Sequence, residues 1–278
     1  MSSVAVRSAR PALAALAAVA GVLVTVAGCS SSSSSSPAAG SSPSASTAGT
    51  APASSGPTAE PTGALALPTA SMTPLPAAAG QLTGTQLESV LLPQSAFPTG
   101  FATPSSGPVS SGASLTTTVA TYNLRTVPCA TFIEHLGTTG FGETAMAASS
   151  VGAAGQGYDQ LVYQFVGATE ANAFVSGIQA LAGRCGSFKV SANGATGTFT
   201  LHAAAGPAVA GQPSVELTET GSLGTNKVSL DLLLCTSGVD VFGAGAAGAN
   251  GTAAPTSVTK QAIIYQLMKR QAAAATLG

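Results

Sequence analysis

The sequence predicts an α+β domain in which helices pack on a central antiparallel sheet, preceded by a long disordered tether. Three observations support this class. The first aromatic residue is Phe97, although the chain holds nine Phe and four Tyr. Beyond residue 187, short alternating segments are joined by glycine-, asparagine- and proline-bearing turns, which favours antiparallel pairing. Helical patterns occur before, within and after the predicted strands, as in α+β layering.

The first 28 residues have the organisation of an export signal. Arg7 and Arg10 form a positive region without acids, and residues 11–27 are apolar and rich in alanine and valine. The segment ends in Val26-Ala27-Gly28-Cys29, which resembles the lipobox of bacterial lipoproteins. That resemblance implies cleavage before Cys29 and transfer of a diacylglycerol to its thiol. An uncleaved anchor or ordinary secretory cleavage are the alternatives; the serine tract that follows favours a lipid-anchored tether.

Residues 29–80 are almost wholly Ser, Ala, Pro, Gly and Thr, with Glu60 as their single charged residue. Such a segment has too little apolar bulk to offset the entropy of ordering it. We therefore expect a disordered linker over 29–80 and one folded domain over 81–278.

The first elements of the domain follow from capping and periodicity. Two capping-box registers, Thr83 with Gln86 and Thr85 with Glu88, predict a helix that stops before Pro93. A second helix is expected from Thr126, as N-cap, to Gly137. Period-two patterns predict strands over 115–124, 144–151 and 158–166.

The second half of the domain holds the clearest helix, over 169–185, with Thr169 as its cap and an apolar stripe that includes Phe174, Ile178 and Leu181. Alternating patterns predict strands over 187–192, 196–202, 214–220, 227–235 and 239–242. A final helix is expected over 256–275, with Lys269 and Arg270 in its later turns, where cations complement the helix dipole.

Three cysteines lie beyond Cys29. Cys129 opens one predicted helix and Cys185 closes another, so a Cys129–Cys185 disulfide would join two helix ends. Cys235 ends an apolar strand and is expected to be a buried, unreactive thiol. Metal binding is disfavoured because the chain has no CxxC motif and only two histidines, His135 and His202. We expect no metal and no cofactor.

Several motifs suggest chemistry but lack their partners. Gly243, Gly245 and Gly248 spell GxGxxG after a strand, yet chain-breaking residues follow and no acid occurs after Asp240. We expect a flexible glycine loop there. The segment 257–260 reads SVTK, but the other motifs of penicillin-recognising enzymes are missing. Adjacent helix residues point about 100° apart, so Glu134 and His135 form no dyad, and an exposed His135 is expected. We expect no catalytic residues and no enzyme.

The charge of the chain argues against nucleic-acid binding. Charged residues make up 7% of the chain, against about 25% in ordinary soluble domains. Without Arg7 and Arg10, the mature chain has seven basic and ten acidic residues, a net charge near −3. It therefore offers no basic surface for a nucleic acid.

The order of features from Leu82 onward resembles one family. The opening LTGTQLESVLLPQSAFPTGF, the Pro128-Cys129 pair, the unit YQFVGATEANAFVSGIQALAGRCGSF, the VSLDLLL strand and the terminal helix look like actinobacterial lipoproteins whose domain is similar to the extracellular sensor domain of the kinase PknH. The resemblance implies a central antiparallel sheet with a concave face that binds an unidentified ligand, and no catalytic residues. The kinase-type domain has two disulfides, for which the cysteines here do not suffice, and any signalling would pass through partners.

Three functions are weighed. The first is a cell-surface lipoprotein, membrane-anchored at Cys29 and exposed to the cell-wall space, with a sensor-like domain that binds an unknown small-molecule or protein ligand. Tyr163, Phe165 and Phe199 would line an apolar site or belong to the core. The second is a lipid or glycolipid carrier, which needs a large apolar cavity. The third is a cell-wall hydrolase, which the sparse inventory of histidines and acids disfavours.

Overall fold

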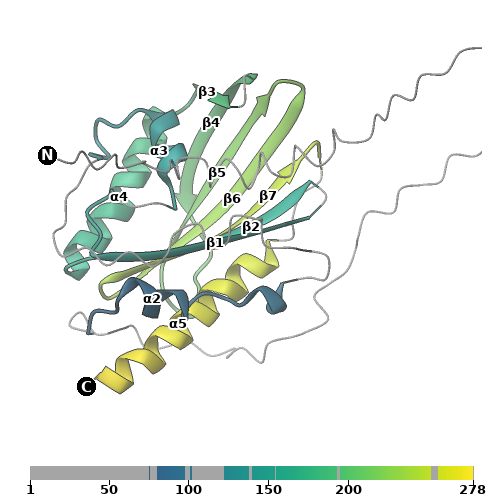
Figure 1. The fold of residues 1–278 in the computed structure, drawn as a ribbon. Coiled ribbons are helices and arrows are strands. Elements are labelled where there is room, and N and C mark those ends of the chain that lie inside the picture. Colours follow the sequence, from purple (N-terminus) through teal and green to yellow (C-terminus); the bar gives the residue numbers. More distant parts are fainter. Residues whose placement is uncertain are drawn as a thin grey trace, which may run out of the picture.

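The structure is a computed structural model that describes residues 75, 80–97, 101, 122–137, 140–153, 155–192, 195–251 and 256–277. The seven described strands form one antiparallel sheet, and helices pack on it (Figure 1). The predicted α+β class is confirmed. The signal segment, Cys29 and most of the linker lie outside the described residues. So does the strand predicted over 115–124, apart from residues 122–124, which are not in a strand.

The sheet brings the last strand of the chain beside a much earlier one. The order is β1-β2-β7-β6-β5-β4-β3, so β7 lies between β2 and β6, and β1 and β3 are the edges. Neighbouring strands are antiparallel throughout. The strands are β1 (Ala145–Ala153), β2 (Gln156–Gln164), β3 (Phe188–Ala192), β4 (Ala195–Ala205), β5 (Ser214–Leu223), β6 (Asn226–Ser237) and β7 (Asp240–Ala249).

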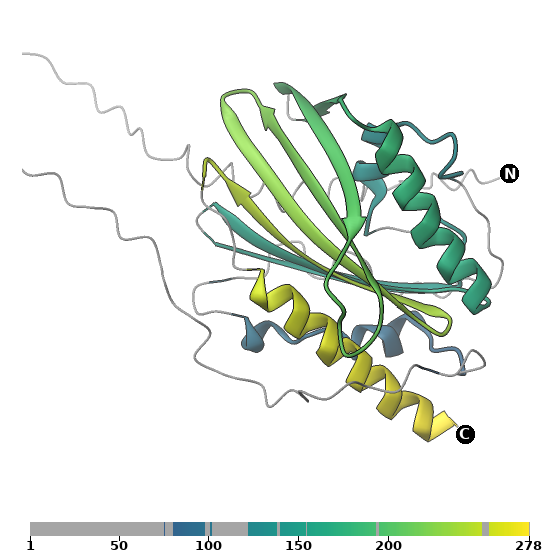
Figure 2. The same ribbon diagram turned by 180° about the vertical axis from the view of Figure 1, so that it is seen from behind.

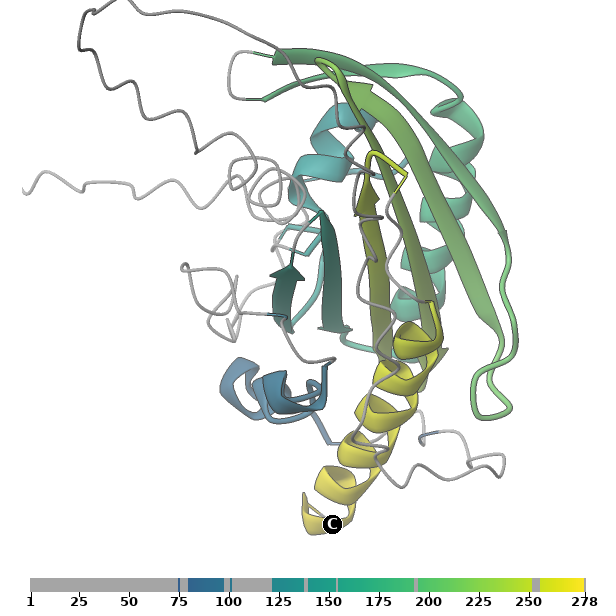
Figure 3. The ribbon, with the colours of Figure 1, turned by 90° about the vertical axis from the view of Figure 1, so that its right-hand side faces the viewer.

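Each face of the sheet packs against its own helices. On one face, here called the α4 face, α3 (Cys129–His135) and α4 (Ala168–Arg184) form a core with side chains such as Tyr163, Phe199 and Leu234. On the other, the α5 face, α2 (Gly84–Glu88) and α5 (Ser257–Leu277) form a second core around Tyr158 and Phe242. Figure 2 shows the same strands, with α4 and α5 on either side of them, from behind. Figure 3 shows how strongly the strands curve.

Strand alternation explains this double burial. Successive side chains of a strand point to opposite faces, and in β2 Leu161 and Tyr163 join the α4-face core while Tyr158 and Val162 join the α5-face core. Because both faces are covered, the inner strands carry apolar residues at odd and even positions alike. The strict apolar–polar alternation of a one-sided sheet is therefore diluted in the sequence.

The expected glycine loop after Phe242 is wrong, because this segment is the buried strand β7. All ten of its residues are buried. A Cβ on Gly243 would lie 2.7 Å from Cδ1 of Leu161, and one on Gly245 would lie 3.1 Å from Cδ1 of Leu230. The glycines therefore make room for leucines of the neighbouring strands β2 and β6, and no nucleotide-binding turn is formed.

Two of the expected helix caps are also wrong, whereas one is confirmed. The N-cap of α3 is Pro128, not Thr126, and that of α4 is Gly167, which places Thr169 inside the first turn. Neither N-cap residue makes a side-chain capping hydrogen bond. The Thr83 capping box is present with Gln86, and α2 begins at Gly84 as expected from it.

Candidate functional site

A small hollow opens on the α4 face, beside the end of α3. We call it the Asp159 pocket and define it by Leu136, Ser150, Asp159, Leu161, Leu230 and Leu232. The space open to the centre of a water-sized sphere is about 40 Å³. Strand register explains the grouping, since Ser150 of β1 pairs with Asp159 of β2, and Gly245 of β7 lies between Asp159 and Leu232 of β6. The lining is mostly aliphatic, with one ionisable group.

The carboxyl group of Asp159 is held but not fully satisfied. The Ser150 hydroxyl donates a hydrogen bond of 2.5 Å to its Oδ1, and no described residue pairs with its Oδ2. Burial raises the pKa of Asp159 to about 6, and the Ser150 hydrogen bond lowers it in part. Above that pH the pocket presents a carboxylate with one oxygen available to a donor.

A second carboxyl group lies on the same face. Glu219 of β5 pairs across the strands with Leu201 and with Leu230, a wall of the pocket. Its side chain is 6% exposed, and no described residue bonds to its carboxyl group. Burial raises the pKa of Glu219 to about 7. An unpartnered buried carboxyl group is costly to ionise.

The charges of the sheet are divided between its two faces. Strand alternation places Asp159 and Glu219 on the α4 face. The described strands carry six further ionisable acidic or basic side chains, which point to the α5 side: Lys189, His202, Glu216, Lys227, Asp231 and Asp240. The described strands thus direct two carboxyl groups and no cationic side chain to the α4 face.

The predicted disulfide between Cys129 and Cys185 is present, with Cα atoms 5.7 Å apart. It joins the first residue of α3 to the C-cap of α4, and so fixes the two helices that flank the α4-face core. Cys235 is free and 1% exposed, and burial raises its pKa to about 12. The prediction of an unreactive buried thiol is in line with this environment.

The three aromatic residues that were candidates for lining an apolar ligand site belong to the hydrophobic core. Tyr163, Phe165 and Phe199 are at most 2% exposed. Tyr163 and Phe165 contact Phe174 of α4, with ring centroids about 5 Å apart. The Tyr163 hydroxyl accepts a hydrogen bond of 2.7 Å from the backbone N–H of Gly137, at the edge of the Asp159 pocket.

The remaining residues that suggested catalysis in the sequence do not form a catalytic group in the structure. His135 is partly buried rather than exposed, because its Nε2 lies 2.8 Å from the hydroxyl of Tyr122. Ser257 and Lys260 are exposed at the start of α5. Among the described residues, no three His, Cys, Asp or Glu side chains are grouped as metal ligands would be.

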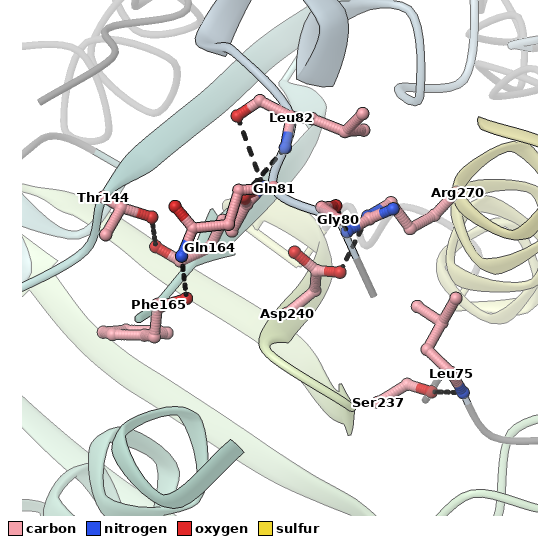
Figure 4. Close-up of polar contacts among 10 residues, drawn as sticks. All are labelled: Leu75, Gly80, Gln81, Leu82, Thr144, Gln164, Phe165, Ser237, Asp240 and Arg270. Carbon is pink, nitrogen blue, oxygen red and sulfur yellow. Dashed lines mark hydrogen bonds and ion pairs between the residues drawn. The ribbon is translucent and has the colours of Figure 1, made fainter. Parts of the chain in front are cut away.

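The α5 face holds a different polar cluster, which bonds to the described residues around helix α2, and Figure 4 draws Gln164, Asp240 and Arg270 of it. We call Gln160, Gln164, Asp240 and Arg270 the entry clamp. Gln164 accepts a hydrogen bond of 2.9 Å from the backbone N–H of Leu82 and donates one of 3.4 Å to its carbonyl. The amide side chain thereby pairs with the backbone as a neighbouring strand would.

Gln160 repeats this pairing on Leu92, with bonds of 2.8 and 2.7 Å. Arg270 Nε donates to Asp240 Oδ2 at 2.8 Å, and Arg270 Nη2 donates to the carbonyl of Gly80 at 2.7 Å. Both side chains of this ion pair are fully buried. The expectation that Arg270 serves the helix dipole is therefore wrong: it pairs with β7 and holds the chain where the domain begins.

Sequence reasoning missed Asp159 and Glu219 as candidate site residues. The signal was available for Asp159, which precedes Leu161 and Tyr163 by two and four positions in the strand and so shares their inward face. A carboxyl group at a core-facing strand position is expensive without a partner, which makes it a candidate for function. For Glu219 the neighbours are separated too far along the chain for the sequence to reveal its surroundings.

Known proteins similar to this chain are found among solved structures. No known family model and no curated protein matches the sequence. Among solved structures, the fold is similar to the extracellular domain of PknH from Mycobacterium tuberculosis, with a TM-score of 0.49 and 17% identical residues. The match covers 70% of this chain and 99% of that one.

None of the helices within the described part of the chain is long and apolar enough to span a bilayer.

Proposed function

We propose that this chain is a cell-surface lipoprotein, anchored through Cys29, whose folded domain is a non-catalytic, sensor-like module that binds a small ligand of the cell envelope. The Asp159 pocket carries the proposal. Binding sites combine an apolar lining with a few placed polar groups, and this pocket sets one available carboxylate oxygen among leucines.

The Cys129–Cys185 disulfide supports the outer face of the membrane as the location. Disulfides persist in oxidising compartments and are rare in the cytosol. The bridge closes a segment with a sequence separation of 56 residues, for which the chain-entropy relation gives about 4 kcal/mol of stabilisation. A domain that depends on such a bridge is suited to the outside of the cell, where the lipobox would place it.

The size of the Asp159 pocket argues against an acyl chain as the ligand of this site. The space open to the centres of water-sized spheres is about 40 Å³, which is room for a few small groups. An acyl chain needs a far longer cavity than this pocket provides. The Asp159 pocket therefore suits the end of a small molecule rather than a lipid tail.

Native mass spectrometry of the full chain, purified without reductant from an actinobacterial host, tests the proposal. We expect a discrete bound mass, which is lost in Ala148→Leu, a variant that fills the hollow. Ala203→Leu, in β4 and outside the pocket, is the matched control and should keep the bound mass. The anchor is tested by intact mass and by membrane fractionation. We expect the added lipid mass and the association with the membrane fraction to disappear in Cys29→Ser. A bare chain, or a mass that survives Ala148→Leu, contradicts the pocket as the binding site.

A further inference from the structure

We propose that the Asp159 pocket selects a cationic amine, namely the protonated end of a primary alkylamine. The ammonium group would contact Oδ2 of Asp159, and the first carbons of the ligand would lie against Leu161, Leu230 and Leu232. This inference rests on the proposed function, since it names the chemistry of the ligand at the same pocket.

The charge of the surrounding face sets the sign of the ligand. Asp159 and Glu219 are the two acidic side chains that the described strands direct toward α4, and no lysine, arginine or histidine of these strands points that way. An anionic ligand would enter an apolar hollow against a like charge, with no cation from the described strands to offset its desolvation. A cation meets the opposite charge there.

The hydrogen bonding of Asp159 sets the type of cation. Ser150 occupies one carboxylate oxygen, so the other can accept one further N–H donor. An ammonium group provides such a donor as a compact charge that suits a small hollow, whereas a guanidinium group is a larger planar fork that pairs best with a carboxylate whose two oxygens are both open. Since ion and oxygen would meet in an apolar surrounding, their hydrogen bond would be charge-assisted.

The volume of the pocket sets the length of the part that enters. The space open to the centres of water-sized spheres is about 40 Å³, which is room for a few small groups. An ammonium nitrogen and two or three methylene carbons occupy that space. Longer parts of the ligand would extend through the open side of the pocket.

Methyl NMR of the full chain, labelled at leucine methyl groups and held in a non-ionic detergent, tests the inference. The probes are n-propylammonium, propionate and 1-propanol at equal ionic strength and near pH 7.4. We expect saturable shifts of the Leu161, Leu230 and Leu232 methyl signals with propylammonium. Its apparent affinity should exceed that of propionate and of propanol at least tenfold.

Asp159→Asn should weaken propylammonium binding at least tenfold while leaving propanol binding unchanged. Asp231→Asn, which removes a carboxyl group on the opposite face of the sheet, is the matched control and should keep wild-type affinity. Three results would overturn the amine assignment. Propionate could bind as tightly as propylammonium or more tightly, both variants could lose affinity for propylammonium equally, or propylammonium could cause no saturable shift. A neutral or anionic probe that shifts the same methyl groups would leave the ligand-binding proposal standing, so the two failures are distinguishable.

Discussion

Replacing Glu219 with glutamine should stabilise the protein at alkaline pH and leave its stability nearly unchanged at acidic pH. Glu219 is 6% exposed and lies between Leu201 and Leu230 on neighbouring strands, and its carboxyl group has no described partner. Its desolvation raises the pKa from 4.5 to about 7. A shift of that size corresponds to about 3 kcal/mol between the protonated and the ionised form.

The sign follows from proton binding. Between pH 4.5 and about 7 the folded state holds the proton of Glu219 while the unfolded state has released it. The free energy of unfolding therefore falls as the pH rises through this window, and the full cost is present above it. Glutamine is neutral at every pH, so Glu219→Gln should gain up to about 3 kcal/mol near pH 8 and little near pH 5.

Urea unfolding followed by far-ultraviolet circular dichroism, near pH 5 and near pH 8, measures this difference. The matched control is Glu216→Gln, since Glu216 lies on the same strand, points to the opposite face and is more exposed. It should change the free energy of unfolding by less than about 0.5 kcal/mol at either pH. If wild type and Glu219→Gln show the same pH dependence, the carboxyl group is not desolvated and the reasoning fails.

Three further predictions concern packing and pairing. Gly243→Ala should lower the free energy of unfolding by about 1–3 kcal/mol, because its Cβ would lie 2.7 Å from Leu161. Gly183→Ala in helix α4 is the control; its Cβ would have no neighbour within 4 Å, so this variant should be neutral or stabilising. Thermal unfolding compares the two variants. Cys235 should resist iodoacetamide in the folded protein near pH 8 and react after unfolding, as intact mass will show. Arg270→Met should cost about 3–5 kcal/mol in urea unfolding, and the added change Asp240→Leu should recover part of it, because the single variant leaves a buried carboxyl group unpaired.

Periodicity predicted the parts of the fold that depend on nearby residues. The apolar stripe of α4 is buried at Ala171, Phe174, Ile178 and Leu181, as its spacing indicates. The capping box at Thr83 depends on a residue three positions away and was also predicted. By contrast, Thr126 and Thr169 are good N-cap types that do not cap, because Pro128 and Gly167 occupy those positions in the folded chain. Local preference alone does not fix a boundary.

Strand β7 shows why the rest could not be predicted. A run of glycine and alanine has low strand propensity and predicts a loop. Part of the bulk that buries it comes from Leu230 and Leu234 of the preceding strand β6. The rest comes from Leu161 in β2, which is distant in sequence from Gly243 and becomes its neighbour only through the strand order. The same holds for Arg270 and Asp240, whose pairing joins two elements 30 residues apart.

The glycines of β7 also account for the position of the candidate site. Without a Cβ on Gly243 and Gly245, the side chains of Leu161 and Leu230 lie down across β7 instead of standing away from the sheet. Both leucines line the Asp159 pocket, and Gly245 lies beside Asp159 in the strand register. The feature that resembled a nucleotide-binding loop thus shapes the floor on which an apolar hollow and its carboxylate meet. A Cβ on Gly245 would lie 3.1 Å from Cδ1 of Leu230 and would push this side chain by a few tenths of an ångström. We therefore expect Gly245→Ala to weaken ligand binding, because the floor and the wall of the pocket consist of the same leucine side chains.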